Sequence, residues 1–238
     1  MSESDQRVLP LVVRIERAAP PDRTDALEAA ARAVLTLLAD ERSTNGEWAE
    51  QVRAWEESRI RKVVRRARGA EWRRVGELPG ITVEMRSAQV RVHPPIPLDG
   101  WPKELSRLQV SGTDLPAAGE PPPPPPGTPV LWLNPALEMS AGKAMAQAGH
   151  AAQLAWWGAD PAGRAAWRAA GLPLAVRTAT PRRWPDLLEG GLPVVRDAGF
   201  TEVEPGTRTV VAEAPWLRDR GGLRPAGSGP LRDPSTGR

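Results

Sequence analysis

The sequence predicts an α/β protein in which a proline-rich segment joins two domains. Three observations predict this arrangement: six consecutive prolines divide the chain, strand-like and helix-like runs alternate before them, and the part after them is ordered β-α-β-α-β-β. That order is typical of a three-layer α/β unit with a mixed sheet. We therefore expect a C-terminal α/β domain preceded by a separate small α+β domain.

Shifts in composition set the expected boundaries. The segments are a disordered N-terminus (1–6), an α+β domain of unknown role (7–116), a proline-rich linker (117–129), an α/β domain (130–217) and a disordered Arg/Gly/Pro tail (218–238). The prolines predict a stiff polyproline II rod that acts as a spacer, and a ligand for an SH3-type domain is the alternative. We find no internal repeat in the sequence.

Composition excludes several classes of protein. Cysteine is absent, which excludes disulfides, thiolate metal sites and cysteine nucleophiles. Only two histidines occur in 238 residues, which argues against a histidine-based zinc centre. No apolar run approaches the roughly 20 residues of a membrane span, and the first residues lack a signal-peptide pattern. We therefore expect a cytoplasmic protein that needs no cofactor and no membrane.

The first half begins with a strand and a helix. The β-rich run at 8–15 predicts the strand. Asp25 and Glu28 have the spacing of a capping box, and the apolar pattern after them predicts a helix over 26–40. Further along, two short strands at 81–85 and 89–93 form a hairpin around residues 87–88.

The second predicted helix of this half covers 46–68, with a bend or break near 57–58, and a basic run begins within its second part. Between residues 59 and 74 the sequence has eight cations and one acid. The cations are Arg59, Arg61, Lys62, Arg65, Arg66, Arg68, Arg73 and Arg74. A basic helix of this kind can offer phosphate contacts to RNA, with Arg59, Lys62, Arg65 and Arg66 as candidates. A solvated face balanced by nearby glutamates and a membrane-surface helix are the alternatives.

The second half contains the candidate chemistry. A buried strand at 129–133 precedes Ser140, which can cap a helix over 141–157. The remaining elements are strands at 172–178, 192–199 and 208–214 and a short helix at 184–191. Asp197 lies at the carboxyl end of the strand over 192–199, where open α/β sheets bind ligands.

Lys143, Gln147 and His150 share one face of the helix over 141–157, opposite an apolar face. A lysine in the first turn is electrostatically unfavourable unless an anion lies nearby, and helix N-termini bind phosphate. An exposed lysine without a role is the alternative. For His150, a packed or hydrogen-bonded histidine is the alternative to a functional one.

Two segments of this half resemble the type 2 (bacterial-archaeal-eukaryotic) peptidyl-tRNA hydrolases. They are GKAMAQAGHA from Gly142 to Ala151 and RDAGFTEVEPGTRTVV from Arg196 to Val211, in the family's order and at about its separation. The resemblance covers residues 129–217 only. It implies a compact α/β/α domain with a four-stranded mixed sheet, a homodimer, and hydrolysis of the ester that joins a peptide to the 3′ ribose of tRNA.

The resemblance also implies roles for individual residues. It gives Lys143, Gln147, Asp197 and Thr201 to catalysis, and His150, Gly142, Gly206 and Thr207 to substrate binding. One departure concerns the segment after the first strand of this half, where the family usually has Arg-x-Asp. This chain has Asn134, Pro135 and Ala136 there, so a cation and a carboxylate are missing.

The residues themselves permit this chemistry. Ester hydrolysis needs an oriented water, a proton acceptor and a group that stabilises the oxyanion. Asp197 can orient or deprotonate water, Lys143 can stabilise the oxyanion, and Gln147 and Thr201 can fix the geometry. Neither a G-x-S-x-G motif nor a P-loop occurs. Two other interpretations stay open: an inactive tRNA-binding module on the same fold, and a first domain that docks the chain on a ribosome or another protein.

Overall fold

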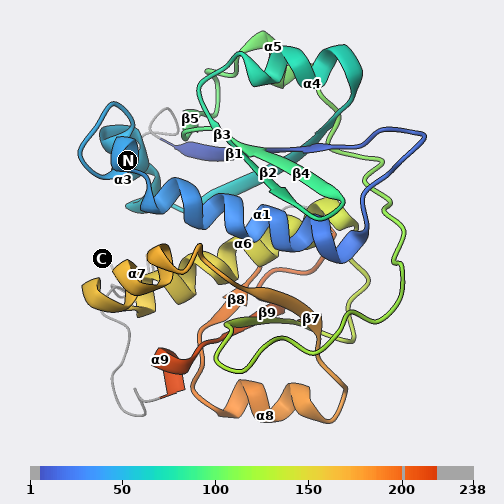
Figure 1. The fold of residues 1–238 in the computed structure, drawn as a ribbon, viewed down its shortest axis with the longest axis vertical. Coiled ribbons are helices and arrows are strands. Elements are labelled where there is room, and N and C mark those ends of the chain that lie inside the picture. The colour runs from blue at the N-terminus through green and yellow to red at the C-terminus, as the bar shows by residue number, and fades with distance from the viewer. Residues whose placement is uncertain (1–5, 200–201, 219–238) are drawn as a thin grey trace, which may run out of the picture.

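The protein is a mixed α/β structure with two mixed sheets and helices packed against them (Figure 1). The computed structural model describes residues 6–199 and 202–218. The first sheet consists of β1 (Arg7–Arg14), β2 (Arg61–Ala67), β3 (Ile81–Met85), β4 (Ala88–Val92) and β5 (Ile96–Pro97). The second consists of β6 (Val130–Leu133), β7 (Ala175–Thr178), β8 (Val194–Arg196) and β9 (Arg208–Glu213).

The helices complete two similar halves. The helices before the proline-rich segment are α1 (Arg23–Ala39), α2 (Glu41–Thr44), α3 (Ala49–Glu56), α4 (Gly69–Gly76) and α5 (Lys103–Ser106). Those after it are α6 (Ala141–Gly158), α7 (Pro161–Ala169), α8 (Arg183–Glu189) and α9 (Pro215–Arg218). We call residues 7–92 the first unit and residues 130–213 the second unit.

The two units repeat one topology. The strand order is β2-β1-β4-β3 in the first unit and β7-β6-β9-β8 in the second. In each, the first two strands are parallel and the other neighbouring pairs are antiparallel. One or more helices connect the first strand to the second, and another helix connects the second to the third. The structure therefore contains a repeat that the sequence does not reveal.

The long helices α1 and α6 lie side by side between the two sheets (Figure 1). Helices α4 and α5 cover the outer face of the first sheet, and α8 covers the outer face of the second (Figure 1). One hydrophobic cluster runs through the inner faces of both sheets and both long helices. The two units thus share a core, whereas the sequence had led us to expect separate domains.

Most elements of the second unit were predicted correctly. β6, α6, β7, α8, β8 and β9 all lie where the sequence placed them, and Ser140 caps α6 by accepting a hydrogen bond from the Lys143 amide. Helix α7 was not predicted. In the first unit β1, α1 and the β3–β4 hairpin confirm the predictions.

The predicted helix over 46–68 is wrong in its second part. Helix α3 ends at Glu56, close to the expected break, and Arg61–Ala67 form the strand β2. Ile60 makes the turn between them with a φ of 45°. The basic helix therefore does not exist. The sequence pattern misled because β2 is an edge strand in which the half-buried Arg61, Arg65 and Arg66 are interspersed with the buried Lys62, Val64 and Ala67.

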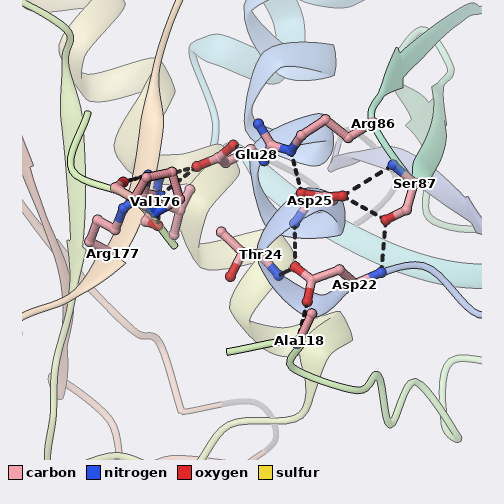
Figure 2. A network of polar contacts seen from close by, with 10 residues as sticks. Asp22, Thr24, Asp25, Glu28, Arg86, Ser87, Ala118, Val176 and Arg177 are labelled. Atoms are coloured by element: carbon pink, nitrogen blue, oxygen red, sulfur yellow. Dashed lines mark hydrogen bonds and ion pairs between the residues drawn. The ribbon is translucent and has the colours of Figure 1, made fainter. Parts of the chain in front are cut away.

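The predicted capping box is also wrong. Helix α1 is capped by Asp22, whose carboxylate accepts hydrogen bonds from the amides of Thr24 and Asp25. Asp25 and Glu28 are instead buried (Figure 2). Asp25 accepts hydrogen bonds from the Ser87 amide and hydroxyl, and Arg86 lies 2.6 Å from its carboxylate.

Glu28 connects the two units. Its side chain is only 3% exposed, and its carboxylate pairs with Arg86 at 2.5 Å and with Arg177 of the second unit at 2.7 Å. It also accepts a hydrogen bond from the Val176 amide of β7 (Figure 2). A buried carboxylate requires such partners, because burial without them costs several kcal/mol.

The proline-rich segment is held against both units. The Ala118 amide donates to the Asp22 carboxylate, and Arg177 donates to the Pro122 carbonyl. Both contacts tie the segment to residues of the hydrogen-bonded network around Glu28. Within residues 6–199 and 202–218, no helix combines the length and the apolar character needed to cross a membrane.

Replacing Glu28 tests the connection between the units. Glu28→Ala leaves Arg177 buried without its carboxylate, so we expect the free energy of unfolding to fall by about 3 kcal/mol. Urea denaturation measures this change. Glu71→Ala, at an exposed position of α4, is the control and should stay within about 0.5 kcal/mol of wild type. Equal stabilities for the two variants would contradict the role of Glu28.

His93 predicts a pH dependence of stability. Burial lowers its pKa to about 4. Its Nδ1 donates to the Pro79 carbonyl at 2.7 Å, and its buried Nε2 has no partner among the described residues. In the unfolded chain His93 takes up a proton near pH 6.5, whereas in the folded chain it stays neutral down to about pH 4. The free energy of unfolding therefore falls by about 1.4 kcal/mol per pH unit as the pH drops from 6.5 to 4. Unfolding curves of wild type and His93→Asn across this range should differ in slope, and parallel curves would refute the assignment.

Candidate functional site

The candidate site joins one face of α6 to the end of β8. Lys143 lies in the first turn of α6, Gln147 one turn further, and Asp197 directly after β8. The Lys143 ammonium is 2.6 Å from Asp197 Oδ2, and Gln147 Nε2 donates to the same oxygen at 2.8 Å. The Lys143 and Asp197 side chains are 9% and 7% exposed. Three residues implied by the resemblance thus converge from segments about 50 positions apart.

Further hydrogen bonds fix this network. Gln147 Oε1 accepts from the Thr209 hydroxyl of β9 at 2.5 Å, which sets the orientation of the amide. Asp197 Oδ1 accepts from the Gly199 amide at 2.8 Å. Gln147 and Thr209 are both buried, so neither can rotate toward water without leaving a polar group unpaired. The site is therefore held rigidly before any ligand binds.

The turn after β8 shapes the backbone of Asp197. Gly206 adopts a φ of 80°, which favours glycine, and its amide donates to the Asp197 carbonyl. The Asp197 amide donates to the Thr207 carbonyl. The Thr207 hydroxyl donates to the Glu204 carbonyl within the turn. Gly206 and Thr207 thus position Asp197, and Thr201 lies outside the described residues.

The N-terminus of α6 is closed by protein groups. Glu202 accepts hydrogen bonds from the Ser140 amide and hydroxyl at 2.7 and 2.6 Å. The Gly142 amide donates to the Thr113 hydroxyl, and a Cβ at this position would lie 2.9 Å from that oxygen. The expected phosphate cradle is therefore engaged internally at Ser140 and Gly142. The carboxylates that face this end of the helix are Glu202 and Asp197.

His150 contacts Lys62 of the first unit. Lys62 Nζ lies 3.2 Å from His150 Nδ1 and 2.6 Å from Gln153 Oε1. Burial lowers the pKa of Lys62 well below its usual 10.5, which Glu56 partly opposes. Burial, with the charges of Lys62 and Lys143, lowers the pKa of His150 well below 6.5.

The other basic candidates are spread over different elements. Arg59 is exposed in the turn before β2. Arg65 donates to the carbonyls of Ser106 and Leu108 and lies over the Trp101 ring. Arg66 donates to the Gln109 side chain and the Ser111 carbonyl. Arg65 and Arg66 thus hold the 106–111 segment, and the sequence pattern does not form one continuous basic surface.

Several residues of the site were missed by sequence reasoning. Thr209, Thr113 and Glu202 belong to strands or loops whose pairing with α6 is set by the tertiary fold. Of these three residues, Thr209 alone lies in a predicted strand, the one over 208–214. Asn134, at the departure from the family pattern, uses its side chain locally: it donates to the Arg208 carbonyl and accepts from the Ala136 amide.

The first unit carries an ion pair at a corresponding place with the charges exchanged. Lys143 is three residues after the N-cap of α6, and Asp25 is three residues after the N-cap of α1. Asp197 directly follows β8, and Arg86 directly follows β3. The carboxylate thus lies on the helix in the first unit and beyond the strand in the second. The remaining oxygens of the first pair are taken by protein donors (Figure 2).

Two cavities lie near these elements. One of about 440 Å³ adjoins the N-terminus of α6 and is lined by residues 109–114, Ser140 and Glu202. A larger one of about 1500 Å³ lies between the proline-rich segment and the second sheet. Its arginines have internal partners: Arg183 and Arg218 pair with Glu213, and Arg177 pairs with Glu28. The smaller cavity is the one next to the candidate site.

Comparison with protein-family models, with curated proteins and with solved structures found no match for this chain. In the part of the chain that the structure describes, no group of three acidic or histidine side chains could hold a metal ion. The geometry of the Lys143–Gln147–Asp197 network is therefore the basis for assigning a function.

A double-mutant cycle tests the ion pair of this network. Lys143→Met leaves a buried Asp197 without its cation, so we expect a loss of about 3 kcal/mol in the free energy of unfolding. Lys143→Met/Asp197→Leu removes both charges and should cost less than the sum of the single variants by at least about 1 kcal/mol. Denaturation of the four proteins measures this coupling. Additive losses would mean that the two charges do not stabilise each other.

Proposed function

We propose that the second unit is a peptidyl-tRNA hydrolase on an α/β/α fold, which cleaves the ester between a peptide and the 3′ ribose of tRNA. One observation carries the proposal: Lys143, Gln147 and Asp197 meet in a single hydrogen-bonded network. These are three of the four residues that the resemblance to the type 2 peptidyl-tRNA hydrolases assigns to catalysis. Lys143 and Asp197 form a buried ion pair near the N-terminus of α6, and Ser140 at that end of the helix lines the smaller cavity.

The network provides the groups that ester hydrolysis needs. Asp197 accepts a proton from a water molecule while the water oxygen adds to the ester carbonyl carbon. The charge of Lys143 stabilises the oxyanion that forms. The bond between the carbonyl carbon and the ribose oxygen then breaks, and the proton returns from Asp197 to that oxygen. Gln147, held by Thr209, keeps Asp197 in place.

A binding module without activity is the second candidate. The observation that favours it is the missing Arg-x-Asp, because the Asn134 side chain is bound to neighbouring backbone and Ala136 has no charge. Such a module would bind tRNA through phosphate contacts, and its affinity would fall steeply with salt. The same assay separates this candidate from the hydrolase.

The decisive experiment incubates the full chain with an N-acetylated aminoacyl-tRNA and follows the release of free tRNA, with and without EDTA. We expect release that EDTA does not abolish. Asp197→Asn and Lys143→Met should each lower kcat/KM by about 100-fold or more, because they remove the proton acceptor and the charge opposite the oxyanion.

Matched variants control for loss of charge alone. Lys103→Met and Asp186→Asn alter an exposed lysine and an exposed aspartate in other helices, and should leave the rate unchanged. Thermal melts identify variants that fail to fold. Tight, salt-sensitive tRNA binding without hydrolysis by the wild-type chain would favour the binding module, and normal rates for both site variants would refute the proposed site.

A further inference from the structure

Lys62 crosses from the first unit to the helix that carries the candidate site. It projects from β2 toward α6 and is only 8% exposed. Its aliphatic stem lies over Gly149, where an added Cβ would be 3.3 Å from Lys62 Cδ. A side chain at position 149 would push the stem away, so the glycine next to His150 makes room for a residue of the other unit.

The surroundings of the Lys62 ammonium are hydrogen-bond acceptors. Nζ lies 3.3 Å from the Ile60 carbonyl, 2.6 Å from Gln153 Oε1 and 3.2 Å from His150 Nδ1. Glu56 accepts from Gln153 Nε2, which orients the amide so that its oxygen faces Lys62. The ring of Trp55 lies 4.7 Å from Nζ. Three acceptors and an aromatic face suit a protonated amine with three N–H groups.

The contact between Lys62 and His150 Nδ1 bears on which imidazole nitrogen carries the proton. A nitrogen that accepts from an ammonium carries no proton, so the neutral ring bears its proton on Nε2. The charged groups around His150 are Lys62 on β2, Lys143 on its own helix and Glu56 on α3, which reaches the cluster through Gln153. His150 Nε2 makes no hydrogen bond to residues 6–199 or 202–218, although the ring is only half-buried.

We propose that Lys62 is a positioning residue of the site, which holds His150 as a neutral Nε2–H donor for an oxygen of the substrate. His150 then binds, and neither takes up nor releases a proton during the reaction. His150 lies about one turn beyond Gln147 on α6, and Lys143 of the candidate site is among the charges that act on its ring. The two neighbouring lysine charges favour an anionic oxygen, which in the proposed substrate is a phosphate of the tRNA 3′ end. The choice of ligand, but not the state of His150, rests on the proposed function.

The first test uses the unaltered full chain. Because only two histidines occur, ¹⁵N-labelled imidazoles give two sets of NMR signals. We expect His150 to show the Nε2–H tautomer and to stay neutral around pH 6.5, with His93 as the internal reference on Nδ1–H. A proton on His150 Nδ1 would overturn the inference, because Lys62 would then be the acceptor.

The second test removes the ammonium. Lys62→Met keeps the stem over Gly149, and we expect the pKa of His150 to rise toward 6.5 while that of His93 stays in place. If the chain hydrolyses peptidyl-tRNA, kcat/KM should fall by up to about 100-fold and become more sensitive to acid pH than that of wild type. Lys62→Gln keeps a hydrogen-bond donor, so its His150 pKa and its kcat/KM should lie between those of wild type and Lys62→Met. Lys103→Met is the control for loss of a lysine.

The outcomes separate this inference from the proposed function. Both NMR measurements need no substrate, so a chain with the expected tautomer and pKa change but no hydrolysis would defeat the proposed function alone. An unchanged His150 pKa in a folded Lys62→Met variant would defeat the positioning role, whatever the activity. Lower activity with an unchanged pH profile would mean that Lys62 acts only on stability.

Discussion

The packing of α1 against α6 is the contact on which the rest of the structure depends. Both helices are rich in alanine, and the buried positions of α6 are mostly alanine or glycine. Small side chains let two helix backbones approach closely, and a Cβ at Gly149 would lie 3.0 Å from Val34 of the opposite helix. The two sheets then lie on opposite faces of the single layer that α1 and α6 form. This approach brings β2 near α6 and β7 near α1.

Polar ties follow from that proximity and are reciprocal. Lys62 on the second strand of the first unit reaches Gln153 on α6, and Arg177 on the second strand of the second unit reaches Glu28 on α1. Each is a long cation on a strand whose charged end reaches an acceptor on the long helix of the other unit. The candidate site is thus supported from outside its own unit, and a description limited to the second unit would omit that support.

The limits of sequence reasoning have the same origin. The second unit was predicted well because its strands are short apolar runs and α6 has a clear cap and a polar stripe. The helix prediction over 46–68 failed in its second part because a short edge strand that mixes cations with apolar residues resembles a basic amphipathic helix over one or two turns. Asp25 and Glu28 have the spacing of a capping box. They are buried instead because the tertiary fold brings Arg86 and Arg177 next to them. Lys143, Gln147 and Asp197 could be grouped in advance, whereas Lys62 and Thr209 could not, because strand pairing sets their distance from α6.

Joining the two units in one chain has a consequence for what each position can become. In a pair of identical subunits related by a two-fold axis, every substitution appears twice and must suit both places. In this chain, the corresponding positions of the two units are encoded separately. The cation and carboxylate near the first turn of the long helix could therefore exchange sides in one unit while the other kept its order. A covalent tether also keeps the unlike halves together at any dilution. Asymmetry of this kind lets one half specialise in support and leaves the other free for chemistry.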